Sequence, residues 1–79
     1  MKGIIIENTG RYFIKSYGNG AAYEMGDKVQ GKDKFVQYGD DAVAFREEYD
    51  NMCLAYLDPR SAWHNQTWDN CLDYLWEQI

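Results

Sequence analysis

The stretch RYFIKSYGNGAAYEM, residues 11–25, decides the fold. Its first seven residues alternate in character, so that Tyr12 and Ile14 share one face of an extended strand. Gly18-Asn19-Gly20 tolerates positive φ and predicts a tight turn. The residues after this turn form a second strand, because a connection this short joins only antiparallel neighbours. The stretch therefore predicts a β-hairpin.

Two further strands extend this hairpin, one on each side. Residues 3–7 form a β-branched run that stops at Asn8-Thr9-Gly10, and residues 34–38 form a short strand after a turn at residues 30–33. All of these connections are too short for a crossover helix. The sequence therefore predicts a four-stranded antiparallel meander over residues 3–38.

After Gly39 the apolar spacing changes to that of a helix. Asp40 or Asp41 is a suitable N-cap, and Asp58-Pro59 ends the helix because the residue before a proline is disfavoured in helical geometry. The first helix is thus expected over about residues 40–57. Its predicted inner face consists of Ala42, Phe45, Tyr49, Met52, Cys53 and Tyr56.

A second helix is expected over about residues 66–78, beginning at Asn65 or Thr67. Its predicted inner face consists of Trp68, Cys71, Leu72, Leu75 and Ile79. The predicted fold is a single α+β domain over residues 1–79, a four-stranded antiparallel β-meander followed by two C-terminal helices.

Composition excludes several classes of protein. A chain of 79 residues with 46% hydrophobic and 16% aromatic side chains suits one small ordered domain. The start MKGIIIE has an apolar run shorter than the roughly 7–15 residues of a secretory signal and the about 20 of a membrane span. We therefore expect a cytoplasmic protein. Its net charge of −5 disfavours direct binding to nucleic acid, which needs basic side chains.

The charge is distributed unevenly along the chain. Residues 1–39 hold six basic and four acidic side chains, whereas residues 40–79 hold two basic and nine acidic ones. In the second helix, Asp69, Asp73 and Glu77 follow at four-residue intervals and are expected on one outward face without a base between them. Like charges at this spacing destabilise a helix by roughly 0.2–0.5 kcal/mol per pair. The stripe is either a solvated, solubilising face or a surface for a basic partner.

The first helix carries acids and apolar residues opposite its inner face. Val43 and Leu54 are expected to pack under the second helix; if they do not, they form an acidic and apolar ridge with Glu47 and Asp50. Trp76 is expected as a core or edge anchor, or, if exposed beside Glu77, as an interface hot spot.

Aromatic side chains are numerous on the predicted strands. Tyr17 and Tyr38, with Lys15 and Lys34 nearby, are similar to the platforms on which single-stranded nucleic acids stack. The alternative is that these aromatics form cross-strand pairs that stabilise the sheet.

No catalytic or metal-binding constellation is evident. His64 has no cysteine or carboxylate at a metal-ligand spacing and is expected in a loop. Cys53 and Cys71 lie on the predicted inner faces, where cysteine behaves as a small hydrophobe. We expect no metal, no cofactor and no enzymatic activity.

Size, acidity and layout, together with GNGAAYEM (18–25) and KFVQYGDDAVAFREEYD (34–50), resemble the small anti-CRISPR inhibitors of phages and mobile elements. The resemblance implies a non-enzymatic inhibitor, in the cytoplasm of a bacterial host, that binds a nucleic-acid-handling effector complex and blocks its access to DNA. Alternatives are a single-stranded nucleic-acid-binding module and a phage accessory or assembly subunit that associates through Val43 and Leu54. The expected partner-binding residues are Asp40, Asp41, Glu47, Glu48, Asp50, Asp69, Asp73, Trp76 and Glu77.

Overall fold

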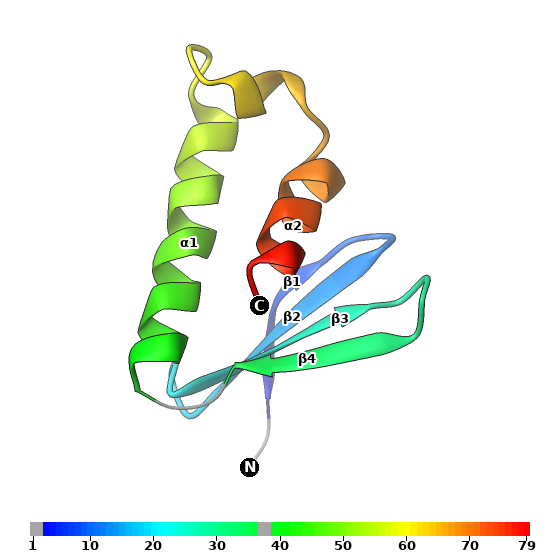
Figure 1. The fold of residues 1–79 in the computed structure, drawn as a ribbon, viewed down its shortest axis with the longest axis vertical. Coiled ribbons are helices and arrows are strands. Elements are labelled where there is room, and N and C mark those ends of the chain that lie inside the picture. The colour runs from blue at the N-terminus through cyan, green and yellow to red at the C-terminus, as the bar shows by residue number, and fades with distance from the viewer. Residues whose placement is uncertain (1–2, 37–38) are drawn as a thin grey trace.

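The computed structural model describes residues 3–36 and 39–79, and it confirms the predicted α+β fold. One antiparallel sheet has the strand order β1-β2-β3-β4, and the helices follow it in the chain (Figure 1). The strands are β1 (Ile4–Asn8), β2 (Tyr12–Tyr17), β3 (Ala22–Asp27) and β4 (Lys32–Val36). The helical elements are α1 (Asp40–Leu57), the short 3₁₀ helix η1 (Ala62–Asn65) and α2 (Trp68–Glu77).

The central hairpin of β2 and β3 forms as predicted. Tyr17 pairs with Ala22 across the turn, and the three turn residues 18–20 all have positive φ. The next turn lies at residues 28–31, two residues earlier than predicted, because β3 ends at Asp27 and β4 already begins at Lys32. The Asp27 carboxylate accepts backbone N–H groups of the following turn and so determines where the chain reverses. The end of the predicted fourth strand, residues 37–38, lies outside the described residues.

β1 is an edge strand with a β-bulge. Ile5 pairs with Lys15, whereas Glu7 pairs with Ile14, so two residues on β1 advance for one on β2. The bulge turns Glu7 toward the face of the sheet that the helices cover, since its partner Ile14 is fully buried there.

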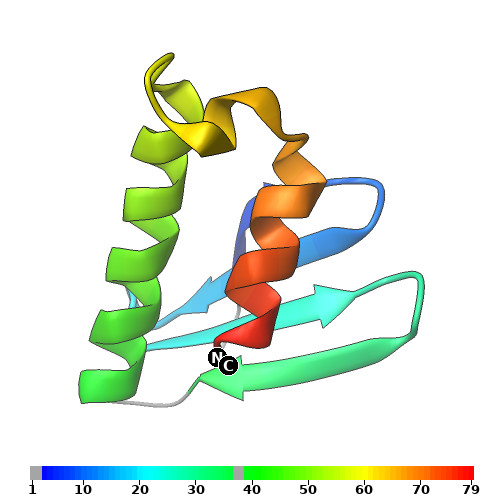
Figure 2. The same cartoon turned by 45° about the horizontal axis from the view of Figure 1, so that its top comes forward.

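Both helices lie on one face of the sheet, antiparallel to each other, with η1 between them (Figure 2). The alternating burial of β2 matches this one-sided cover. The predicted inner residues Phe45 and Tyr49 of α1 and Leu72 and Leu75 of α2 are buried in the core. The remaining core residues are Tyr12, Ile14, Tyr23, Met25, Val36, Ala42 and Trp76.

The helix termini follow the predictions in part. Thr67 caps α2, its side chain accepting the N–H of Asn70, and α1 ends at Leu57 before Asp58-Pro59. The N-cap predicted at Asp40 or Asp41 is wrong. Gly39 occupies the cap with φ 78°, and both aspartates lie in the first turn. Carboxylates in the first turn still favour the helix, because they face its positive dipole end.

Candidate protein-interaction surface

The solvent side of α1 carries a continuous stripe of acidic and large apolar side chains. Its six residues follow at intervals of three and four, the spacing that keeps side chains on one helical face. All of them are exposed, including Val43, Leu54 and Leu57 at 57%, 68% and 71%. We call this the outer stripe; it consists of Asp40, Val43, Glu47, Asp50, Leu54 and Leu57.

The outer stripe overturns one expectation about the first helix. Val43 and Leu54 do not pack under α2, because α2 lies across the sheet and meets α1 along its inner face only. The inner residues, such as Phe45 and Tyr49, alternate with the outer ones along the chain. α1 therefore buries one side and presents the other to solvent with three large apolar side chains still uncovered.

The acidic residues of α1 are mostly without a counterion. Asp50 pairs with Arg46, with 3.1 Å between its Oδ1 and the arginine Nε. Within residues 3–36 and 39–79, the other four acids of α1 form no ion pair; they are Asp40, Asp41, Glu47 and Glu48. The negative potential predicted for the C-terminal half is therefore concentrated on α1.

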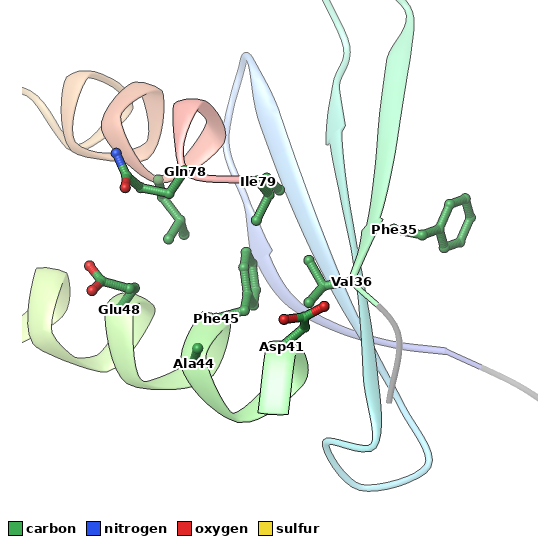
Figure 3. A pocket seen from close by; sticks show the side chains of 9 residues that line it. Phe35, Val36, Asp41, Ala44, Phe45, Glu48, Gln78 and Ile79 are labelled. Atoms are coloured by element: carbon green, nitrogen blue, oxygen red, sulfur yellow. The ribbon is translucent and has the colours of Figure 1, made fainter. Parts of the chain in front are cut away.

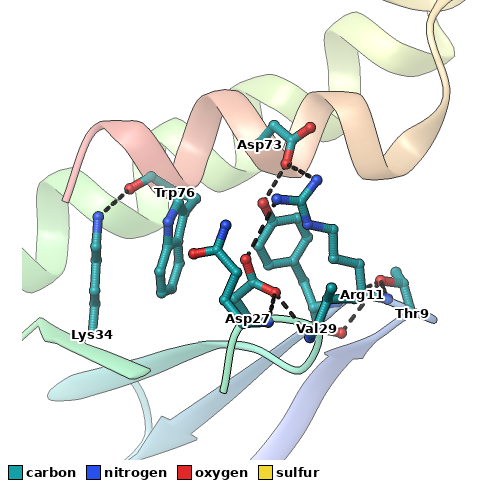
Figure 4. Close-up of polar contacts among 9 residues, drawn as sticks. Thr9, Arg11, Asp27, Val29, Lys34, Asp73 and Trp76 are labelled. Carbon is teal, nitrogen blue, oxygen red and sulfur yellow. Dashed lines mark hydrogen bonds and ion pairs between the residues drawn. The ribbon is translucent and has the colours of Figure 1, made fainter. Parts of the chain in front are cut away.

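The predicted acidic stripe of α2 is wrong at its centre. Arg11 reaches across from the start of β2, and its Nη1 lies 3.1 Å from Oδ1 of Asp73 (Figure 4). The Tyr12 hydroxyl donates to the same carboxylate. Asp69 is half-buried on the same helix, and Glu77 is exposed. Asp73 thus joins the helix to the sheet and is removed from the candidate contact residues.

Beneath Asp73, Arg11 also faces the fully buried carboxylate of Asp27, at 3.5 Å. Burial alone would raise the pKa of Asp27. The backbone N–H groups of Gln30 and Val29 and the charge of Arg11 outweigh burial, so this pKa lies below its ordinary value. The carboxylate therefore stays ionised at neutral pH and holds Arg11 in place.

Trp76 is buried, which confirms the prediction of a core anchor and rules out the alternative of an exposed hot spot. It is 7% exposed and packs against Tyr12, with 5.9 Å between ring centroids. The ammonium group of Lys34 lies 4.3 Å from the centroid of the indole and donates to the carbonyl oxygens of Trp76 and Ile79. A second cation from the sheet therefore occupies the C-terminal end of α2, where the helix dipole favours it.

The sequence did not single out Glu7, although its carboxylate contacts both helices. Its carboxylate accepts the Tyr49 hydroxyl at 2.6 Å and the Trp68 indole N–H at 2.8 Å. Burial, followed by this hydrogen bond, raises the pKa of Tyr49 above its ordinary value. An acid directly after the isoleucine run, still within the predicted strand, was the available signal. Because both contacts are structural, Glu7 links β1 to the two helices.

The two cysteines are unpaired in the structure. Cys53 lies half-buried beside Glu7 in a shallow groove, and Cys71 is fully buried. Burial raises the pKa of both thiols above the ordinary value. Both thiols are therefore protonated at neutral pH, which is the opposite of the thiolate that nucleophilic chemistry requires.

Tyr17 and Phe13, on the uncovered face of the sheet, contact other residues of the same face. The Tyr17 hydroxyl donates to the buried carboxylate of Glu24 at 2.7 Å, and the Phe13 ring lies over Gly26. Phe35 is 62% exposed. A carboxylate in the middle of this face opposes phosphate binding. The alternative of cross-strand aromatic pairs is not observed either, because the aromatic pairs of the described residues join the sheet to the helices or lie between helical elements. Tyr38, the other residue predicted for stacking, lies outside the described residues.

No protein-family model, curated protein or solved structure matches this chain. Among the described residues, no helix combines the length and apolarity needed to cross a bilayer. Those residues also include no group of three or more histidine, cysteine, aspartate or glutamate side chains placed to hold a metal ion. The arrangement best suited to a function is thus the exposed surface of α1.

Proposed function

We propose that this protein is a non-enzymatic inhibitor that docks through the outer stripe of α1 onto a basic protein surface of a nucleic-acid-handling effector complex. The supporting observation is that three exposed acids and three exposed large apolar side chains share one helical face. Charge complementarity would accelerate the encounter, and the apolar side chains would supply buried area on contact. The resemblance to anti-CRISPR inhibitors suggests a CRISPR effector as the complex.

The number of charges favours docking on protein over imitation of a whole duplex. α1 has 18 residues, about 27 Å of helix, along which duplex DNA places about 16 phosphates. The helix has five acidic residues and one arginine. The proposed inhibitor therefore blocks DNA by covering a basic patch, with apolar contacts contributing much of the affinity.

The test is binding to a purified CRISPR effector complex at rising salt, with two double variants of equal net charge. Glu47→Gln/Glu48→Gln removes two carboxylates of α1. Asp33→Asn/Glu77→Gln removes two exposed carboxylates outside α1, and it includes Glu77, the expected contact residue of α2 that this proposal leaves out. The first is expected to weaken binding about tenfold and to flatten the salt dependence, and the second by less than about twofold. Equal losses, or no binding by the unchanged protein, would contradict the proposal.

The same preparation tests the assembly alternative. Light scattering at high concentration would detect association of the chain with itself through Val43 and Leu54. If a stable oligomer forms and Val43→Ser/Leu54→Ser dissociates it, the outer stripe serves self-assembly instead of inhibition.

A further inference from the structure

A pocket of about 410 Å³ opens between the first half of α1, the end of β4 and the end of α2 (Figure 3). Phe45 and Val36 lie toward its interior, and Ile79 approaches it from the end of the chain (Figure 3). Leu75, Ala44 and Phe35 complete the apolar part of the lining. The pocket thus has an apolar floor.

Two carboxylates and one amide border this apolar floor. Asp41 and Glu48 come from α1, and Gln78 follows α2. Asp41 and Glu48 are seven residues apart, which is about two turns or 10.5 Å along the same side of the helix. Both are exposed, and neither forms an ion pair within the described residues. The nearby Lys34 leaves their charge in place, because its ammonium is bound to main-chain oxygens of α2.

We infer that this pocket receives an arginine side chain of the basic partner; this inference rests on the proposed function. The aliphatic part of arginine matches the floor formed by Phe45 and Val36, and its charge matches the carboxylates at the rim. The lining offers two carboxylates and no histidine or cysteine, and the described residues include no group of three or more such side chains placed to hold a metal ion. Arginine suits the site better than lysine, because its planar group is less strongly hydrated and stacks on aromatic rings.

The volume agrees with this occupant. Sites for drug-sized molecules range from about 300 to 1,000 Å³, and 410 Å³ lies near the lower limit. One arginine side chain is smaller than a drug-sized molecule and fits within such a space. The pocket lies beside the outer stripe on the same helix, since Asp41, Ala44 and Glu48 each follow a stripe residue by one position. A partner lying along the stripe therefore has the pocket within reach of a side chain.

The experiment is an NMR titration of the ¹⁵N-labelled protein with a capped tetra-arginine peptide, and with tetra-lysine of the same charge. We expect tetra-arginine to shift the amides of Ala44, Phe45 and Ile79 most. Glu48→Gln is expected to weaken binding about threefold more than Glu47→Gln, an adjacent change of equal charge that lies outside the pocket. Ala44→Leu, which fills the pocket without changing charge, is expected to weaken binding. Ala62→Leu, the same change at an exposed alanine of η1 outside the pocket and the outer stripe, is expected to leave binding unchanged.

Equal effects of Glu48→Gln and Glu47→Gln, or no effect of Ala44→Leu, would overturn the pocket. Equal affinity for tetra-lysine would overturn the assignment of arginine. These outcomes are separate from failure of the proposed function. Loss of effector binding in Glu47→Gln/Glu48→Gln with normal binding in Ala44→Leu would retain the docking helix and remove the pocket from it.

Discussion

Replacing Lys34 by methionine tests whether the sheet holds α2 through a cation. The lysine Nζ lies 3.1 Å from the Trp76 carbonyl oxygen, 3.0 Å from that of Ile79 and 4.3 Å from the centroid of the indole. Methionine keeps most of the aliphatic contact and removes the charge and both hydrogen bonds. With about 1 kcal/mol for each hydrogen bond of a partly hydrated ammonium and about 0.5 for the indole contact, the loss is about 2.5 kcal/mol. For a domain of this size that lowers Tm by about 10–20 °C.

The matched control is Lys32→Met, two residues earlier on the same strand. Lys32 is exposed, and its replacement changes the net charge by the same amount. Urea denaturation at pH 7 is expected to show a loss below about 0.5 kcal/mol for this control. Hydrogen exchange at the amides of Gln78 and Ile79 gives a second readout, because these amides bond within the end of α2 that Lys34 covers. Equal losses in the two variants, with unchanged exchange, would refute the reasoning.

Three further predictions concern the sheet and its buried polar groups. Gly26→Ala would place a Cβ 2.1 Å from the Phe13 ring and 2.8 Å from an oxygen of the exposed Asp33. Urea denaturation should therefore show a free energy of unfolding lower by about 1–2 kcal/mol. With Phe13→Ala present, the same change should cost less than about 0.5 kcal/mol. Because the folded pKa of Asp27 lies below 3.8, its contribution is complete above that pH and is lost as the pH falls through the folded pKa; the free energy of unfolding should therefore drop more between pH 5 and pH 2 in the unchanged protein than in Asp27→Asn. The raised pKa of Tyr49 acts in the opposite direction, so stability should fall above pH 10, and Tyr49→Phe, which costs about 1 kcal/mol at neutral pH, should reduce that alkaline loss.

The fold was predictable because its signals are local. Alternation along β2, the glycines of its turn and the three-and-four spacing of α1 each depend on residues within a few positions of one another. The N-cap of α1 was mispredicted because glycine and aspartate both occupy such positions, and the choice depends on how the preceding chain enters the helix.

The candidate site was predictable only in part, because its decisive contacts join distant parts of the chain. The Tyr12 hydroxyl and Asp73 are 61 positions apart, and Lys34 and Trp76 are 42 apart. Counting charge along the sequence treats the basic and acidic halves as separate, although folding brings Arg11 onto Asp73. The acids of α1 retain their exposure because no basic strand residue reaches them within the described ranges.

The bulge of β1 also affects how the protein behaves at high concentration. A free strand edge is a template on which another molecule adds its own strand, and such addition leads to aggregates. The irregular spacing between Ile5 and Glu7 interrupts the even row of donors and acceptors that an incoming strand needs. This local distortion therefore protects the isoleucine-rich edge strand β1 against intermolecular sheet growth. The opposite edge strand, β4, depends on its lysines for the same protection.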